Sequence, residues 1–377
     1  MKNKFEISSI AAIVGVLLTG QANAIEIFKN DTSSVSTRGW LRLTLQSTEN
    51  TDEITDSGSR WGLDYKHKIE GGWTAGMTAE WATNFEKNSN LSVTAGGDSR
   101  SPSGSSGDAL TSRLGFVHFT HDKWGSFGVG KQWGVFYDIV GVTDMLNYYG
   151  GNATGAYNFG TDGGLSGTGR AEQAITWRKA FGNINVGIQM QAQDEAVILN
   201  APNTPVLDGE EIATMGNGYG AAVSYKADNF SVGVAVNTSE IDIAPAFGGG
   251  SEDDIATALS ATYGQFGEGL HVAAAFVTSE NHELDNTGDY IDAIGTEVLV
   301  RYTMPSRIAI YGGMNMLESD QSNSDYELSY PFVGAEYAFE NGFGLVFVEA
   351  KAHDDTNSDG STGNDESEFA MGVRVNL

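Results

Sequence analysis

The chain has 377 residues, including 49 Gly, 6 Pro and no Cys, and carries a formal net charge of −28. Its 40% of apolar and 10% of aromatic residues make it too hydrophobic for a disordered acidic chain. The lack of cysteine excludes disulfide scaffolds, thiolate zinc sites and cysteine nucleophiles, and the acidic balance argues against a nucleic-acid partner. The length fits either two soluble domains or one large all-β barrel.

The N-terminus has the pattern of a secretory signal peptide. Lys2 and Lys4 precede an apolar run from Ile10 to Leu18, and Ala22-Asn23-Ala24 supplies the small residues of a cleavage site. At about nine residues, the run is too short to cross a bilayer as a helix. The sequence therefore predicts a signal peptide over 1–24 and one mature domain over 25–377, whose charge is −29 because the lost segment carries +1.

The mature chain alternates between apolar and polar residues. Between Val35 and Leu45, odd positions are mainly apolar and even positions mainly polar, which is the period of a β-strand with one polar face. Sixteen such segments occur, and no helical period interrupts them. They are 35–45, 59–69, 73–84, 109–121, 125–133, 169–178, 183–193, 216–226, 229–239, 254–263, 269–279, 293–303, 307–317, 327–339, 343–352 and 367–377.

The connections between these segments alternate in length. Short turns such as 180–182, 227–228 and 304–306 alternate along the chain with long polar loops such as 194–215, 240–253 and 280–292. All short turns would therefore lie at one end of the strands and all long loops at the other. Short turns on one side and long loops on the other are typical of an outer-membrane β-barrel, which pairs every backbone group without leaving an edge. We therefore predict a sixteen-stranded antiparallel transmembrane β-barrel. A secreted β-sandwich or jelly roll also alternates and stays as the competing fold.

The two faces of the predicted strands differ as a barrel wall requires. Apolar rows, such as Val232, Val234 and Val236, are expected to face lipid. The opposite faces, expected to line a wet lumen, carry Asn185, Gln189, Gln191, Gln193, Asn237 and Arg374. Aromatic residues near predicted strand ends, expected to form an interfacial girdle, are Tyr65, Trp73, Trp81, Trp177, Tyr225, Tyr263, Tyr302, Tyr337 and Phe339.

One connection, over residues 134–168, is far longer than a hairpin needs. Its first half contains apolar residues that a solvated loop would not carry, and its second half is rich in glycine. The apolar residues are Phe136, Tyr137, Ile139, Met145, Leu146, Tyr148, Tyr149, Tyr157 and Phe159. Because these side chains must pack against something, we expect the loop to fold into the lumen of the barrel.

This loop resembles the constriction loop of the general diffusion porins of gammaproteobacteria. The resemblance lies in the stretch from Phe136 to Leu146, with its Thr143-Asp144-Met145-Leu146 core, and in Tyr149-Gly150-Gly151. The preceding stretches 111–116 and 128–134 and the mature start at 25–31 are similar as well. The resemblance implies a homotrimer of sixteen-stranded barrels in the outer membrane of a Gram-negative bacterium, each with its third loop folded inward.

The resemblance also implies a pore constriction, in which loop acids face basic residues on the opposite wall. Arg60, Arg113, Arg170 and the loop acid Asp144 match the family by their flanking residues. The family's first-strand basic residue falls on Trp40, with Arg38 and Arg42 on either side, and a second loop acid falls on Tyr148. The predicted constriction residues are Arg42, Arg60, Arg113, Asp144, Tyr148 and Arg170.

These departures bear on selectivity. With Asp144 facing several arginines, the constriction is expected to favour cations less than in related porins, whereas the −29 charge draws cations to the mouth. We expect weak cation selectivity overall. The C-terminus also departs, because the family usually ends in Phe and this chain ends in Leu377.

A calcium-loop pattern occurs near the C-terminus. Asp355, Asn357, Asp359, Gly360 and Glu366 fit the twelve-residue template, although the flanks are predicted strands rather than helices. A divalent cation at the outer loops is therefore a possible ligand, either in this loop or in an acidic rim that bridges lipopolysaccharide phosphates. No organic cofactor and no catalytic motif is predicted.

The predicted function is an outer-membrane porin through which small hydrophilic solutes and ions diffuse passively. Two alternatives stay open: a solute-selective porin with an oligosaccharide track, for which Trp40, Tyr148 and Tyr149 would supply aromatic rings, and a receptor or adhesin barrel that uses its acidic loops. Expected partners are the solutes, outer-membrane lipid and lipopolysaccharide, and two further copies of the chain.

Overall fold

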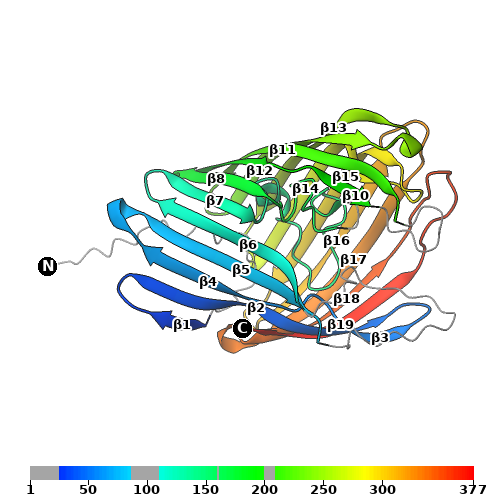
Figure 1. Cartoon of the computed structure of the whole chain (residues 1–377). Coiled ribbons are helices and arrows are strands. Elements are labelled where there is room, and N and C mark those ends of the chain that lie inside the picture. Colours follow the sequence, from blue (N-terminus) through cyan, green and yellow to red (C-terminus); the bar gives the residue numbers. More distant parts are fainter. Residues whose placement is uncertain (1–24, 86–109, 159–160, 199–208) are drawn as a thin grey trace.

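Neighbouring strands pair antiparallel all the way round the molecule, and the last strand, near the C-terminus, pairs with the long strand that begins at Ser33 (Figure 1). The computed structural model describes residues 25–85, 110–158, 161–198 and 209–377. The predicted signal peptide over 1–24 lies outside these residues. The ring closes where Trp40–Ser47 pairs antiparallel with Phe369–Asn376.

The strands of the described residues follow in chain order. They are β1 (Glu26–Lys29), β2 (Ser33–Ser47), β3 (Asp52–Asp56), β4 (Arg60–Lys68), β5 (Thr74–Thr83), β6 (Leu110–His121), β7 (Gly125–Lys131), β8 (Ala174–Phe181), β9 (Ile184–Gln191), β10 (Glu195–Ile198), β11 (Glu211–Lys226), β12 (Phe230–Ile243), β13 (Gly250–Tyr263), β14 (Gly269–Leu284), β15 (Tyr290–Thr303), β16 (Ile308–Ser319), β17 (Glu327–Ala338), β18 (Gly344–Ala352) and β19 (Ser367–Asn376).

These segments form a closed sixteen-stranded antiparallel barrel, because three of them continue other strands. β3 and β4 lie one after the other along the same side of β2, and β10 follows β9 along β11. β1 pairs with the start of β2, beyond the point where β19 ends. The predicted barrel is therefore confirmed.

The strand boundaries differ from the prediction in several places, and the loop expected over 194–215 includes β10 and the start of β11. The strand expected over 169–178 begins only at Ala174, because the glycine-rich stretch before it stays in the loop. Conversely, the loops expected over 240–253 and 280–292 are short, because β12 to β15 continue to Ile243, Gly250, Leu284 and Tyr290. These extensions keep the hydrogen-bonded ladder but carry polar residues on their outer face, so the apolar alternation ends before the strand does.

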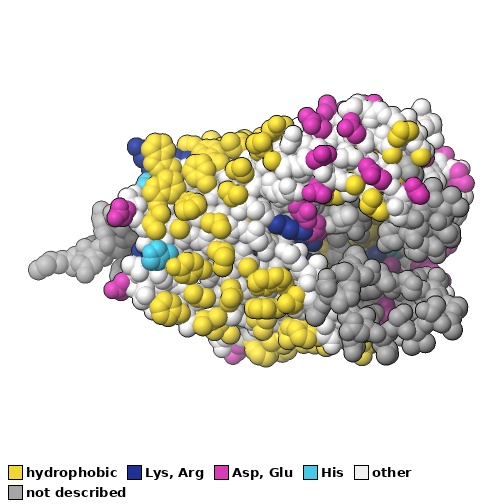
Figure 2. Space-filling view, in the orientation of Figure 1, with side chains coloured by type: hydrophobic (Ala, Val, Ile, Leu, Met, Phe, Trp, Pro, Cys, Tyr) yellow, Lys and Arg dark blue, Asp and Glu magenta, His cyan; other side chains and the backbone are white. Residues whose placement is uncertain are grey.

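The outer surface has an apolar belt and an acidic end. The predicted outward row of Val232, Val234 and Val236 is exposed on β12, as are Phe369 and Met371 on β19. Figure 2 shows apolar side chains spread over the barrel wall and Asp and Glu gathered toward one end. Because a lipid-facing wall must be apolar where the membrane lies, the belt marks the membrane-embedded part of the barrel.

Helical structure is scarce in the described residues. There is one short α-helix, α1 (Tyr137–Val140), and single 3-10 turns at Glu70–Gly72, Pro245–Phe247 and Glu340–Gly342. None of the described helices is long and apolar enough to span a membrane. α1 belongs to the connection between β7 and β8, residues 132–173, which is called the constriction loop below. Its described parts, 132–158 and 161–173, lie inside the ring of strands (Figure 1), and Phe159 lies outside the described residues.

Candidate pore constriction

The constriction loop packs its apolar residues on the inner wall, as its composition predicts. Val135, Phe136, Tyr137, Ile139 and Val140 are buried against the inner face of β11 to β14, where the side chains are small. These wall residues are Ala222, Ala235, Ala256, Ala258 and Val277. Gly233 adds to this space, because a Cβ there would lie 2.7 Å from Cδ1 of Ile139. The small wall residues therefore make room for α1.

Two glutamates of the wall hold the loop by its backbone. Glu349, on β18, accepts hydrogen bonds from the amide nitrogens of Asn147, Tyr148 and Tyr149 at 2.7, 2.8 and 3.0 Å. It also accepts the Tyr311 hydroxyl at 2.7 Å. Both oxygens of this buried carboxylate are thus occupied, so it fixes the turn at the end of the loop's first half.

Glu297, on β15, acts in the same way farther along the loop. It accepts the amide of Ala153 at 2.9 Å and the hydroxyl of Thr143. The loop backbone lies so close to the wall here that a Cβ on Gly295 would collide with the Ala153 carbonyl. Burying a carboxylate is costly unless it is well hydrogen-bonded, and both wall glutamates meet that condition with loop donors.

The glycine-rich half of the loop is held by amide side chains. Gln189 donates to the Gly167 carbonyl at 2.9 Å, Gln191 to the Gly164 carbonyl at 2.9 Å, and Asn237 to the Ser166 carbonyl at 2.6 Å. All three amide residues are buried. The prediction that they face a wet lumen is therefore wrong: they do point inward, but the loop covers them.

The predicted loop acid Asp144 is hydrogen-bonded within the loop. Its Oδ2 accepts the hydroxyls of Tyr137 at 2.6 Å and Tyr157 at 2.7 Å. Burial, followed by the charge of Asp144, raises the pKa of both tyrosine hydroxyls above the ordinary range, so they stay protonated donors. The other predicted loop residue, Tyr148, donates its hydroxyl to Gln46 on β2.

A second loop acid, Asp162, contacts the basic residues directly. Its Oδ2 lies 3.0 Å from Nε of Arg170 and 2.9 Å from Nζ of Lys131. Burial opposes ionisation here, but Arg170 and Lys131 outweigh it and lower the pKa of Asp162. Sequence reasoning missed this residue because it lies among glycines, outside the motif that identified the loop.

The predicted arginines on the wall fall into two groups. Arg113 is ion-paired: its Nε lies 3.0 Å from Glu80, which also takes Nε of Arg38 at 2.9 Å. Arg42 and Arg60 form no ion pair within the described part of the chain. Arg42 donates its Nε to the Ser57 carbonyl at 2.7 Å, and the guanidinium of Arg60 lies 3.9 Å from the centre of the Trp40 ring.

The structure thus brings Arg42 and Arg60 together at one part of the wall, and places Arg113 with Glu80 and Arg170 with Asp162. Asp144 and Tyr148 lie on the loop with partners of their own. The face-to-face arrangement of Asp144 and the arginines across the pore stays a prediction. With Arg38, Arg42, Arg60, Arg113 and Arg374, the inner surface of β2, β4, β6 and β19 is called the arginine wall below.

The family model described as Gram-negative porin matches residues 9–377. The chain belongs to the Gram-negative porin family. The porin is 28% identical to outer membrane protein Omp-EA of Erwinia amylovora, over 92% of this chain and 84% of the relative. It is 24% identical to outer membrane porin F of Escherichia coli, over 88% of each. Its fold is similar to that of the OmpF structure of Salmonella typhi in complex with daunomycin, with a TM-score of 0.71 at 20% identity over 93% and 99% of the two chains.

The predicted family, fold and location are therefore confirmed. The porin is an outer-membrane channel through which small hydrophilic solutes and ions diffuse passively. The rival β-sandwich is excluded by the closed ring of strands. The sequence of the loop around Asp144 carried the resemblance that identified the family. The contacts described above show that this loop folds into the lumen.

The predicted calcium loop does not assemble. Asp355 accepts the amide of Ser329 at 2.8 Å and contacts His353, while Asn357 donates to Ser361. Asp359 also accepts from Ser361, and Glu366 accepts from Asn50 at 2.7 Å. Asn357 and Asp359 both turn to Ser361, whereas Asp355 turns to Ser329 on β17 and Glu366 to Asn50, so the four side chains do not converge on one point. Among the described residues, no group of three or more His, Asp or Glu is placed to hold one metal ion.

Proposed function

We propose that this porin is a homotrimeric general diffusion channel whose narrowest part lies between the constriction loop and the arginine wall. The observation that carries the proposal is the double anchorage of the loop inside the lumen by Glu297 and Glu349. A loop held in this way narrows the pore without depending on a bound ligand. The trimer is expected from the resemblance to the family.

In the same proposal, the channel works without catalysis and without an organic cofactor, and it has no sugar track. The aromatic rings that such a track would need are engaged: Tyr148 is bonded to Gln46, and Tyr149 packs edge-on against Tyr148 at 4.8 Å. One face of the Trp40 ring is covered by Arg60. A sugar slide requires open ring faces, so these contacts favour general diffusion over the oligosaccharide-selective alternative.

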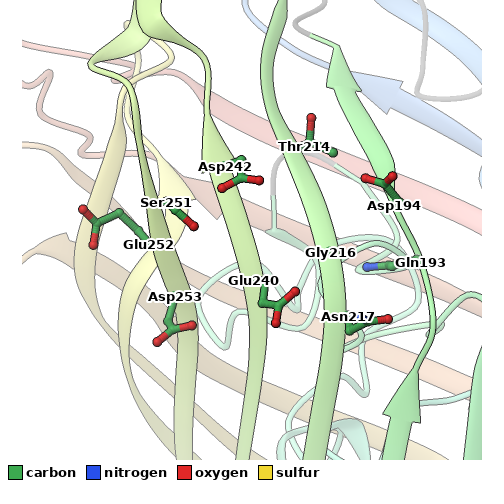
Figure 3. A pocket seen from close by; sticks show the side chains of 10 residues that line it. All are labelled: Gln193, Asp194, Thr214, Gly216, Asn217, Glu240, Asp242, Ser251, Glu252 and Asp253. Atoms are coloured by element: carbon green, nitrogen blue, oxygen red, sulfur yellow. The ribbon is translucent and has the colours of Figure 1, made fainter.

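The acidic end of the barrel is proposed to contact lipopolysaccharide through divalent cations. A hollow of about 590 Å³ on neighbouring strands is lined by five carboxylates, whose side chains are among those in Figure 3. They are Asp194, Glu240, Asp242, Glu252 and Asp253. Glu240 and Asp242 continue the outward row of Val232 to Val236 on β12, beyond the apolar belt. Since no three described acids are placed to hold one ion, the cations would form a diffuse layer.

Single-channel recording in planar bilayers tests the proposed channel. We expect stepwise closures in threes, no block by maltose oligosaccharides and a weakly cation-selective reversal potential at low salt. Raising the salt shortens the Debye length to about 3 Å at 1 M, which screens the acidic mouth more than the constriction, so cation selectivity should fall. Block by micromolar oligosaccharide would favour a selective porin, and absence of current would favour the receptor or adhesin.

A further inference from the structure

A histidine of the wall binds the glycine-rich half of the constriction loop at two points. Nε2 of His282, on β14, lies 2.8 Å from the carbonyl oxygen of Gly155, and the backbone carbonyl of His282 accepts Nδ2 of Asn158 at 3.0 Å. The imidazole is fully buried. Gly155 has a φ of +65°, which favours glycine, and a Cβ there would press on the ring, 2.9 Å from Nε2. The loop backbone therefore lies directly against this ring.

An irregularity in β14 aims the histidine at the loop. The register with β15 shifts between Ser279 and Glu283, and Asn281 between them has a left-handed φ of 49°. A bulge of this kind bends a strand and redirects its side chains. As a result, the consecutive residues His282 and Glu283 are both buried, where regular alternation would turn one of them outward. They lie on the part of β14 that continues beyond the apolar belt.

Both ring nitrogens of His282 face acceptors. Nδ1 lies 2.6 Å from Oδ1 of Asp254 on β13, and Nε2 faces the Gly155 carbonyl. A neutral imidazole has one N–H and one lone pair, so it cannot donate to both. The two contacts need two protons, one on Nε2 and one between Nδ1 and Asp254. If one proton leaves, the carboxylate keeps the other because its hydrogen bond is charge-assisted, and the lone pair of Nε2 then faces the Gly155 carbonyl.

The surroundings of the ring favour the state with two protons. Burial opposes the charge on His282, but Asp254, Glu283 and the Gly155 carbonyl outweigh burial and raise the pKa of the imidazole to about 9. A raised pKa in the folded state means that the stabilisation is complete below the ordinary value of 6.5 and is lost as the pH rises through the raised value. The other titratable side chains that interact with this cluster are Glu283, Tyr290 on β15 and Tyr326 before β17.

We propose that His282 is a positioning residue of the constriction, which holds the glycine-rich half of the loop while Nε2 carries a proton and releases it when that proton is lost to water. The contact between wall and loop would then change from a hydrogen bond to a repulsion between two lone pairs. A looser loop at alkaline pH is the consequence. The inference rests on the proposed function, because the hold on the loop affects the current only if the loop borders the narrowest part of the pore.

The test is the variance of the single-channel current of the purified protein in planar bilayers, recorded at constant KCl from about pH 6 to about pH 10. For the wild type we expect a quiet current at neutral pH and a rise in variance with a midpoint near pH 9. His282→Gln supplies an amide that can donate to the Gly155 carbonyl but does not titrate, so its variance should stay constant over this range. His282→Ala removes the donor and should be noisy at every pH.

Asp254→Asn keeps the ring but removes the carboxylate that favours its charge. The midpoint of the rise should therefore fall toward 6.5, the ordinary value for histidine. This shift also tests the proposal if His282→Gln fails to insert. His121→Gln is the matched control, because Nε2 of His121 also lies on a backbone carbonyl, that of Gly71 at 3.1 Å, but at a short turn away from the loop. It should keep the midpoint of the wild type.

Three results would overturn the proposal. A wild-type variance that stays constant over the whole range would remove the role of His282 and leave the channel function standing. A rise that persists in His282→Gln with an unchanged midpoint would assign the titration to another group. Absence of current from the wild type at neutral pH would instead overturn the proposed channel, and the role of His282 with it.

Discussion

The wall that carries the constriction loop and the arginine wall use charge in opposite ways. On β15 and β18, Glu297 and Glu349 are fully buried, and their oxygens are occupied by loop donors. On β2, β4 and β19, Arg42, Arg60 and Arg374 have no ion-pair partner in the described part of the chain. The buried glutamates therefore hold the loop that shapes the pore. The arginines without ion-pair partners remain able to attract anions that pass through it.

The largest expected effect on stability comes from removing the hydrogen bonds by which Glu349 holds the constriction loop. In Glu349→Gln, an amide replaces a carboxylate that accepts three loop amides and one hydroxyl, and its NH₂ group faces donors. We expect about 3 kcal/mol of lost stability or more, together with a noisier and larger single-channel current as the loop loosens. The measurements are the temperature at which the proposed trimer dissociates and the variance of the single-channel current.

Glu340→Gln is the control for Glu349→Gln, because Glu340 is exposed at a short turn. It should leave both the dissociation temperature and the noise unchanged. A quiet, wild-type current from Glu349→Gln would show that the loop is held by its apolar packing alone, and the comparison between the two walls would lose its basis.

The second prediction concerns the charge balance of the arginine wall. Glu80 pairs with both Arg38 and Arg113, and Arg38 also pairs with Asp64 at 3.2 Å, so Glu80→Gln leaves Arg113 without an ion-pair partner. The reversal potential under a salt gradient should move toward anions, and folding stability should fall by about 2 kcal/mol. If the reversal potential stays constant, Glu80 does not face the permeating ions, and the selectivity must be set at the mouth.

The sequence predicts those features of the two walls that depend on neighbouring residues, and misses those that depend on residues far apart in the chain. Alternation of apolar and polar residues over β12 or β19 predicts a lipid-facing row, because successive side chains of a strand point to opposite faces. Glu349 contacts Asn147, about two hundred residues away in sequence, and no local pattern announces such a partner. A hint was present, since Glu297 and Glu349 are acids at inward positions in the middle of their strands.

The sequence also leaves open which acid meets which arginine. Asp144 lies in the recognisable motif and was expected to face the arginines, yet its hydrogen bonds go to two tyrosines. Asp162 meets Arg170 instead, and only the folded path of the glycine-rich half brings them together. The predicted ends of some strands were wrong for a different reason. The apolar alternation of β12 stops at the edge of the apolar belt, whereas its hydrogen-bonded ladder continues beyond it.

The third prediction uses pH to probe the ion cluster of Asp162, Arg170 and Lys131. The pKa of Asp162 is below its ordinary value of 3.8, so its stabilisation is complete above that value and is lost as the pH falls through the folded-state pKa. The stability difference between wild type and Asp162→Asn, about 1 kcal/mol, should be constant from pH 7 to about 4 and shrink below it. A difference that already shrinks between pH 7 and 5 would assign the titration to another group.

The smallest expected effect is kinetic and concerns the seam between β19 and β2. The amide of Leu377 donates to the Gly39 carbonyl at 3.0 Å, and a phenylalanine would keep this backbone bond. Leu377→Phe should therefore leave the conductance and dissociation temperature of the finished channel unchanged. Because related porins usually end in phenylalanine, which the barrel-assembly machinery recognises, we expect the variant to assemble faster in cells, followed as the rate at which heat-resistant trimers appear. Equal rates for the two chains would show that the rest of the apolar row on β19 suffices for recognition.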